Sequence, residues 1–233
     1  MKRTLGIIGL FIASASAVVL ILDRVAEPSA APVSVTVKFP HEVVFPWEGE
    51  TTLFDQAGQR LTWKVEHLET EVHLIGIHPQ WRVEHHAKAD GTPLSTVKQA
   101  GRSTTRVTWL AEGARVDRTD SHGKTSSITI HEPGLWDEST VVARLAGVSW
   151  RPGEQVRLRL VDLTLADGTV YPMVAEYVRE ERCGNLRCHH VHLALDDFRR
   201  LVSPTFELRY STAPGAKFLQ YDGEGFTFSA TGQ

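Results

Sequence analysis

Apolar and polar residues alternate along most of the chain after about residue 34. The alternation is clearest in runs at 35–39, 61–65, 81–83, 107–109, 156–160, 206–210 and 226–228. A period of two puts every second side chain on one face of an extended chain, which predicts half-buried β-strands. Pairs typical of hairpin turns separate the runs: Ala57-Gly58, Asp90-Gly91, Glu112-Gly113, His122-Gly123, Asp167-Gly168, Gly184-Asn185 and Asp222-Gly223.

Helical spacing of apolar residues is confined to two short segments. The first runs from Asp137 to Gly147, and the second from Asp196 to Val202, where Pro204 follows. Glycine at the end of the first and proline after the second are typical of helix ends. The expected fold is mainly β: a strongly curved antiparallel sheet or open barrel with one or two short helices. We expect residues 34–233 to form a single β-rich domain.

The N-terminus has the pattern of an export segment. Lys2 and Arg3 precede an apolar run over residues 5–22. Its length suits either a cleaved signal peptide or an uncleaved membrane anchor. Both alternatives place the rest of the chain outside the cytoplasm, because the cations remain inside. We therefore predict a signal peptide or anchor at residues 1–22, a tether at 23–33, and a periplasmic or cell-envelope location, with the anchor lying in the inner membrane.

Composition and motifs exclude several classes of protein. The chain has 25 Lys+Arg against 28 Asp+Glu, a net charge of −3. A nucleic-acid binder usually has a basic excess, so we expect no nucleic-acid partner. The sequence has no Gly-x-Ser-x-Gly, no His-Glu-x-x-His and no glycine-rich phosphate loop. We therefore expect neither an enzyme nor a bound cofactor.

Two cysteines, Cys183 and Cys188, flank the turn pair Gly184-Asn185. In an oxidising compartment a close, even-numbered pair most simply forms a disulfide. We expect the bond to close a hairpin with four residues between directly opposed cysteines.

Histidines close to these cysteines offer an alternative. His190 and His192 could join Cys183 and Cys188 in a zinc site, because zinc prefers thiolate and imidazole ligands. Direct pairing of the cysteines would instead put Glu181 opposite His190 on a polar strand face, where the two form a cross-strand pair. The disulfide is the first prediction, and metal binding by His190 and His192 is the alternative.

One strand has large apolar side chains on both faces. Tyr171, Met173 and Tyr177 alternate with Val174 and Val178, which we expect on the packed core side. If the short helix covers one face, the other could line a cavity. Tyr171, Met173 and Tyr177 are therefore the predicted ligand-binding residues, and the alternative is a solid core on both faces.

The order of short motifs resembles a known family. The motifs are Asp-Gly-Thr-Pro-Leu at 90–94, Trp109-Leu110, Leu135-Trp136-Asp137, Trp150–Glu154 and Phe218–Gly223. Over about residues 40–228 the chain is similar to bacterial periplasmic domains of unknown function built as curved open barrels, which resemble Lol-type lipoprotein carriers in shape. The cysteine hairpin and the long N-terminal segment depart from that pattern. The resemblance implies an envelope role and an apolar ligand, and it supplies no catalytic residue.

Together these observations predict an exported, non-enzymatic envelope domain that binds an apolar, lipid-like molecule or a partner protein. It would contact the membrane through its N-terminal segment. The alternatives are a secreted histidine-based metal-binding protein and a hydrolase of unrecognised type.

Overall fold

The computed structural model describes residues 36–38, 47–163, 168–201, 203, 205–213, 217–223 and 226–230. The chain divides between Pro32 and Val33 into two units, and every described residue belongs to the second. Within the described part, no helix is long and apolar enough to cross a membrane. The predicted export segment and tether lie outside the described residues.

Sixteen strands form one sheet in the second unit. Their bounds are β1 (Thr36–Lys38), β2 (Gly49–Asp55), β3 (Arg60–His67), β4 (Glu71–His78), β5 (Trp81–Lys88), β6 (Pro93–Ala100), β7 (Ser103–Leu110), β8 (Gly113–Thr119), β9 (Thr125–Ile130), β10 (Leu135–Asp137), β11 (Glu154–Val161), β12 (Val170–Cys183), β13 (Leu186–Leu195), β14 (Phe206–Ser211), β15 (Phe218–Gly223) and β16 (Phe226–Ser229). The helical elements of the described residues are α1 (Val141–Arg144) and the 3-10 turns η2 (Leu145–Gly147) and η3 (Phe198–Leu201).

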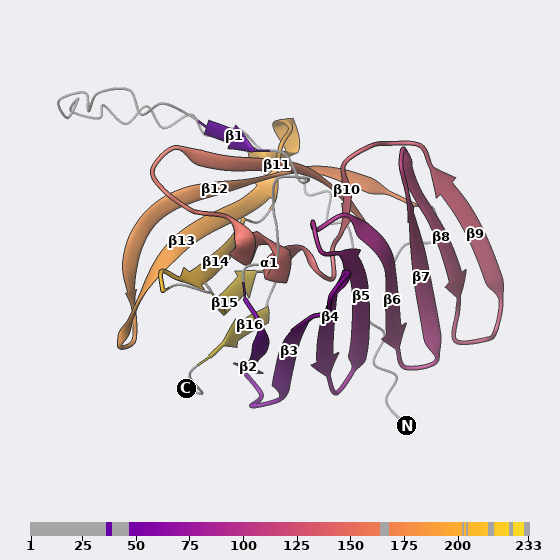
Figure 1. Ribbon diagram of the computed structural model, residues 1–233, viewed down its shortest axis with the longest axis horizontal. Coiled ribbons are helices and arrows are strands. Elements are labelled where there is room, and N and C mark those ends of the chain that lie inside the picture. Colours follow the sequence, from indigo (N-terminus) through magenta and orange to yellow (C-terminus); the bar gives the residue numbers. More distant parts are fainter. Residues whose placement is uncertain are drawn as a thin grey trace, which may run out of the picture. The chain divides into compact units, whose positions relative to one another are not determined.

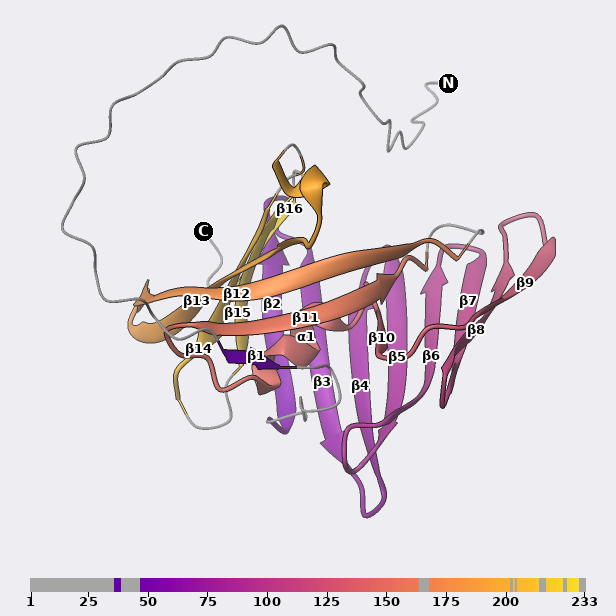
Figure 2. The same cartoon turned by 90° about the horizontal axis from the view of Figure 1, so that it is seen from above.

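The sheet is built from two runs of antiparallel hairpins, β2 to β9 and β11 to β16, joined where β16 pairs with β2. Parallel strands β1 and β10 both pair with the outer edge of β11, and β9 forms the opposite edge. Figures 1 and 2 show that the sheet curves strongly around α1 without closing. The prediction of a mainly β, curved antiparallel sheet is confirmed.

The period-two pattern has a direct structural meaning. In β3, Leu61, Trp63 and Val65 are all buried, whereas Lys64 between them is exposed. The Trp63 ring packs over the neighbouring strand β4 at Gly76, where the absence of a side chain leaves space for it. A Cβ atom at Gly76 would lie 2.6 Å from the Trp63 ring, so no larger residue fits there without a shift.

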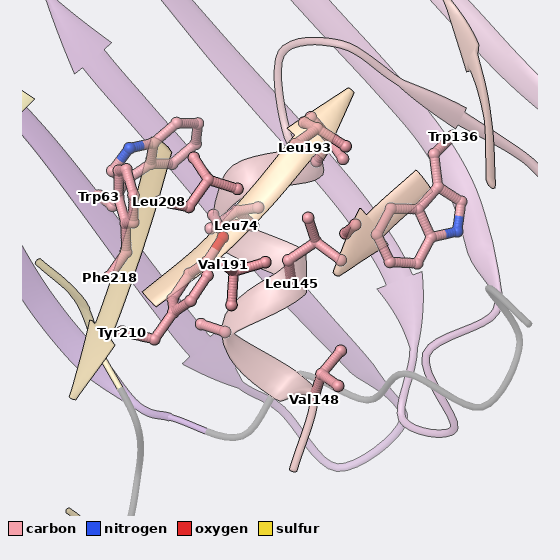
Figure 3. Close-up of a cluster of buried hydrophobic side chains, with 14 of the residues drawn as sticks. Trp63, Leu74, Trp136, Leu145, Val148, Val191, Leu193, Leu208, Tyr210 and Phe218 are labelled. Carbon is pink, nitrogen blue, oxygen red and sulfur yellow. The ribbon is translucent and has the colours of Figure 1, made fainter. Parts of the chain in front are cut away.

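The main core lies on the concave face of the sheet, where α1 and η2 pack (Figure 3). Tyr210 of β14 donates a hydrogen bond from its hydroxyl to the Val142 carbonyl at 2.8 Å. Trp150 donates from its indole nitrogen to the Leu145 carbonyl at 3.1 Å. Both hairpin runs of the sheet contribute other buried members of this core. They include Trp63, Leu74, Val191, Leu208 and Phe218.

A second core cluster joins the two ends of the sheet. Trp109, Val116 and Ile130 of β7 to β9 pack on Leu135 and Val161 of β10 and β11. Because the strand order ends at β9, the contact between β7 to β9 and β10 to β11 is made by side chains and not by strand pairing.

Three sequence expectations need correction. The helix expected at 137–147 is shorter, because Leu135–Asp137 pairs as β10 with β11 and α1 begins only at Val141. The segment expected to be helical at 196–202 contains a 3-10 turn at Phe198–Leu201. The pair Asp222-Gly223 is not a turn, because both residues end β15 and pair with β16.

Candidate functional site

The predicted ligand-binding residues lie in packed surroundings. Met173 is a member of the main core and is only 5% exposed. Tyr171 and Tyr177 are partly buried and pack against the same core. All three therefore contact the cluster that α1 and η2 fill, and ligand binding by them stays a prediction.

The prediction that the packed core lies on the face of Val174 and Val178 is wrong, because the main core includes Met173 and neither of these valines. Val174 is buried, but Val178 is 36% exposed, so the expected core position of Val178 is wrong. The pairing register with β13 shifts between Tyr177 and Arg179. A bulge of this kind leaves a residue unpaired and turns it out of the regular alternation.

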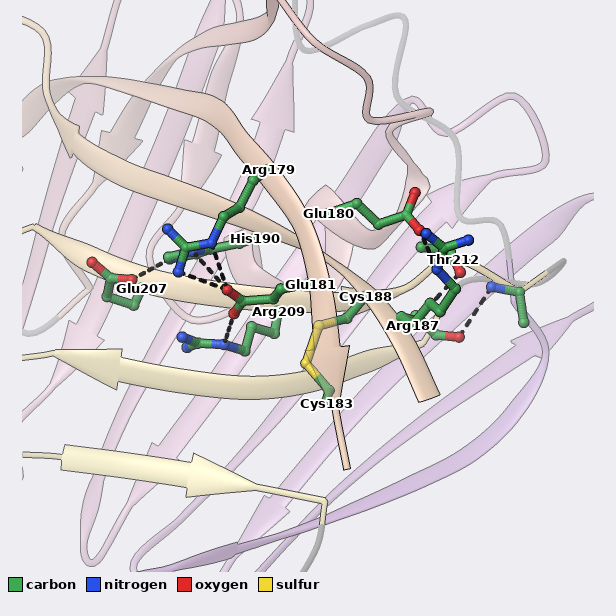
Figure 4. Close-up of a disulfide and its surroundings, with 12 residues drawn as sticks. Arg179, Glu180, Glu181, Cys183, Arg187, Cys188, His190, Glu207, Arg209 and Thr212 are labelled. Atoms are coloured by element: carbon green, nitrogen blue, oxygen red, sulfur yellow. Dashed lines mark hydrogen bonds and ion pairs between the residues drawn. A yellow bond between two sulfur atoms is a disulfide. The ribbon is translucent and has the colours of Figure 1, made fainter. Parts of the chain in front are cut away.

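Cys183 and Cys188 form the predicted disulfide, with Cα atoms 6.0 Å apart. The turn contains only Gly184-Asn185, and Gly184 has a positive φ of 60° that favours glycine. Cys183 therefore pairs with Leu186, and the disulfide crosses the hairpin diagonally (Figure 4). Because both sulfurs are bonded to each other, neither is available as a thiolate ligand, and the zinc set that includes the cysteines is wrong.

The tighter turn also shifts the expected cross-strand pairs. Glu181 lies opposite Cys188, and Arg179 lies opposite His190. Direct opposition of Glu181 and His190 is therefore wrong, but the two still approach each other. Oε2 of Glu181 lies 3.6 Å from Nδ1 of His190.

His190 and His192 meet a third polar side chain that the sequence analysis missed. Glu207 of β14 lies directly opposite His192 in the adjacent strand. Its Oε1 is 3.0 Å from Nε2 of His192, and its Oε2 contacts Nε2 of His190. Burial lowers the pKa of His190, although the hydrogen bond and the negative charge of Glu207 partly raise it. Two imidazole nitrogens thus converge on one carboxylate, a donor set able to hold a metal ion.

The cations around this cluster are already paired. Arg179 and Arg209 each donate a hydrogen bond of 2.7 Å to Glu181 (Figure 4). Burial alone would raise the pKa of Glu181, but these hydrogen bonds hold it below its usual value. Glu181 therefore offsets one of these two positive charges.

A second polar arrangement, also missed, lies inside the protein. Thr96 accepts hydrogen bonds from the Trp109 indole at 3.1 Å and from Nδ1 of His85 at 2.8 Å. Its hydroxyl donates to Asp137 at 3.1 Å. Asp137 also accepts from the backbone nitrogen of Thr140 at 2.9 Å and from its hydroxyl at 2.8 Å. The residues come from β5, β6, β7, the end of β10 and Thr140 just before α1, so the network holds the start of the helix onto the sheet.

The same interior region contains a charged group. Arg144 is 2% exposed, and its guanidinium lies 3.9 Å from the centre of the Trp136 ring. Burial lowers the pKa of Arg144 to about 10, with the charge of Asp137 opposing the shift. Burial also raises the pKa of Asp137 and lowers that of His85 well below 6.5. None of these side chains reaches solvent, which favours a structural role for the network over a catalytic one.

Comparisons with known proteins add little to this geometry. No protein-family model matches the chain, and no curated protein matches it. A solved β-barrel-like protein of the domain of unknown function DUF1849 from Brucella abortus is similar over 78% of this chain and 92% of its own, with 9% identity and a TM-score of 0.47. A "putative lipoprotein" from Parabacteroides distasonis is similar over 80% of this chain and 95% of its own, with 10% identity and a TM-score of 0.28.

The first of these neighbours is a β-barrel-like domain of unknown function, the kind of protein that the sequence resembles. The likeness to Lol-type carriers is not confirmed. At these levels of similarity, neither neighbour carries a function over to this chain.

Proposed function

We propose that this protein is an exported, non-enzymatic domain of the cell envelope that binds a partner protein by adding an extended segment of that partner to the edge of its sheet. The observation that supports this proposal is the free edge of β9. Within the described residues, β9 pairs only with β8.

The composition of β9 is unusual for an edge strand. Its sequence is Thr-Ser-Ser-Ile-Thr-Ile, with no charged residue and no proline. Exposed edges usually carry charges, prolines or bulges, because these prevent pairing with another chain. The opposite edge of the sheet is covered by β1 and β10. Within the described residues, the β9 edge thus combines exposure with an unprotected sequence.

The hydrogen-bonding register of β9 identifies the groups that face outward. The Asp120 nitrogen donates to the Lys124 carbonyl at 3.0 Å, which makes this a hydrogen-bonded pair. Such pairs alternate along an antiparallel ladder. Ser126, Ile128 and Ile130 therefore bond to β8, and the backbone groups of Thr125, Ser127 and Thr129 point away from it. These three residues are available to pair with an added strand.

Filling of the concave face favours a protein partner over an apolar small molecule. Side chains of α1 and η2 contact the core on that face, together with Met173. A lipid-like ligand would have to displace these contacts, whereas strand addition at β9 leaves the core unchanged.

Export is supported by the sequence, through Lys2, Arg3 and the apolar run at 5–22. Alkaline phosphatase, which is active only outside the cytoplasm, should be active when fused after Gln233. A fusion active only with a cytoplasmic reporter would contradict export.

Strand addition can be tested with a photo-crosslinking amino acid at Thr129, whose side chain is exposed. In living cells it should give one defined adduct with another envelope protein, mapped to an extended segment. Ile77 is the matched control, because it is 44% exposed but lies in the interior strand β4. Equal labelling from both positions, or an adduct only with a second copy of this chain, would contradict the proposal.

A further inference from the structure

We propose that His190, His192 and Glu207 form a binding site for a divalent transition-metal ion, with zinc as the best fit. This inference does not depend on the partner-binding proposal, because the site lies on β13 and β14 rather than on β9.

The backbone brings the three ligands together. His190 and His192 are two residues apart in β13, so their side chains lie on the same face of the sheet. Glu207 is opposite His192 in β14. The ligand atoms of the three residues lie within 4.8 Å of one another. Small side-chain rotations would bring them to the roughly 2.0–2.2 Å bonds that zinc makes with imidazole and carboxylate.

The surroundings of His190 resemble those of a metal ligand. Histidines that bind metals through one ring nitrogen usually direct the other toward a carboxylate. Nε2 of His190 faces Glu207, and Nδ1 lies 3.6 Å from Oε2 of Glu181. His190 is only 4% exposed, so its ring is held in place by its neighbours.

Glu181 is itself fixed as an outer carboxylate. Arg179 and Arg209 hold its two oxygens from either side, each at 2.7 Å. The disulfide between Cys183 and Cys188 joins the strands beside it. The proposed site therefore has three ligands around the ion, and the fixed carboxylate of Glu181 lies next to one of them, His190.

The three-residue set leaves room for a fourth ligand. Zinc sites with three protein ligands keep one position for water or another molecule. His192 and Glu207 are about one-third exposed, so that position faces solvent. A small anion or a side chain from another protein could occupy it.

A second histidine cluster provides a comparison within the same molecule. Glu71, His73 and His86 lie on β4 and β5, with 3.0 Å between Nε2 of His73 and Oε2 of Glu71. All three are partly exposed, and His86 lies opposite His73. This cluster lacks a buried histidine, so a metal ion should prefer the site at His190.

The test is zinc titration of the full chain, purified in mild detergent without a histidine tag and monitored by calorimetry. We expect one zinc per chain, and binding that weakens in acid because protons compete with the metal ion for its ligands. Cobalt should bind at the same site and give the intense visible absorption of a four-coordinate ion.

Variants separate this site from the alternatives. His192→Ala and Glu207→Gln change half-buried residues, and each should lower zinc affinity at least tenfold with little change in melting temperature. The matched control His86→Ala should leave affinity unchanged. Absence of zinc binding by the native chain would overturn the proposal. So would binding that is lost in His86→Ala but kept in Glu207→Gln.

Discussion

Replacement of Asp137 by alanine tests the view that the buried polar network holds α1 onto the sheet. The substitution removes the acceptor of three hydrogen bonds, one from Thr96 and two from Thr140. It also removes a buried negative charge that acts on Arg144. Donors left without a partner in the interior cost about 1–3 kcal/mol each. A charge left without its counter-charge costs about 3–5 kcal/mol.

These costs overlap because the same neighbours relax together, so we expect a loss of about 3–5 kcal/mol in the free energy of unfolding. For a domain of this size, each kcal/mol lowers the melting temperature by about 2–4 °C, which gives a decrease of about 6–20 °C. The assay is urea denaturation together with thermal melting followed by circular dichroism.

Asp117→Ala is the matched control. Asp117 is partly exposed and pairs with Arg115, so its loss should lower the stability far less than the loss of Asp137. Equal effects of the two substitutions, or a loss below about 1 kcal/mol for Asp137→Ala, would refute the structural role of the network.

Three further outcomes follow from the structure. Replacing Cys183 and Cys188 by serine should cost about 2 kcal/mol, because the disulfide closes a loop of only a few residues; thiol counting on the native chain should find no free cysteine, and two free thiols would contradict the bond. Burial raises the pKa of Glu138 to about 7, so between pH 4.5 and 7 the folded state binds more protons than the unfolded state and stability decreases as pH rises. Glu138→Gln should remove this contribution to the pH dependence of the free energy of unfolding, measured by urea denaturation across the same range. The same pH dependence in the variant and the native chain would contradict the raised pKa. Met173→Asp should lower the melting temperature much more than Val178→Asp, since Met173 is 5% and Val178 36% exposed; the reverse order would mean that Met173 lines a cavity.

Local patterns were sufficient to predict the mainly β fold, strands such as β3, and the hairpin disulfide. Leu61, Trp63 and Val65 alternate in the sequence and are all buried in β3. The cysteine spacing predicted the bond, but not the two-residue turn that shifts the register of the hairpin. Register depends on turn geometry, and a small change in the turn changes every opposing pair.

The interior network and the histidine cluster depend on contacts that no local pattern contains. Thr96 and Asp137 are 41 residues apart, and their hydrogen bond exists because the fold brings β6 close to the end of β10. His190 and Glu207 are 17 residues apart on neighbouring strands. His190 and His192 were visible as candidate ligands, but Glu207 could be assigned only once β14 was placed beside β13.

Strand addition at β9 is the central claim, and Ser127→Pro tests it most directly. The Ser127 N–H points away from β8, so proline removes a donor that an added strand needs without breaking the existing ladder. Ser127→Ala keeps the N–H and serves as the control. The measurement is the yield of the crosslinked adduct from Thr129, with the melting temperature of each variant determined in parallel. We expect the adduct to be lost in Ser127→Pro and retained in Ser127→Ala, with melting temperatures close to that of the native chain. An undiminished adduct in a folded Ser127→Pro protein would contradict strand addition at this edge.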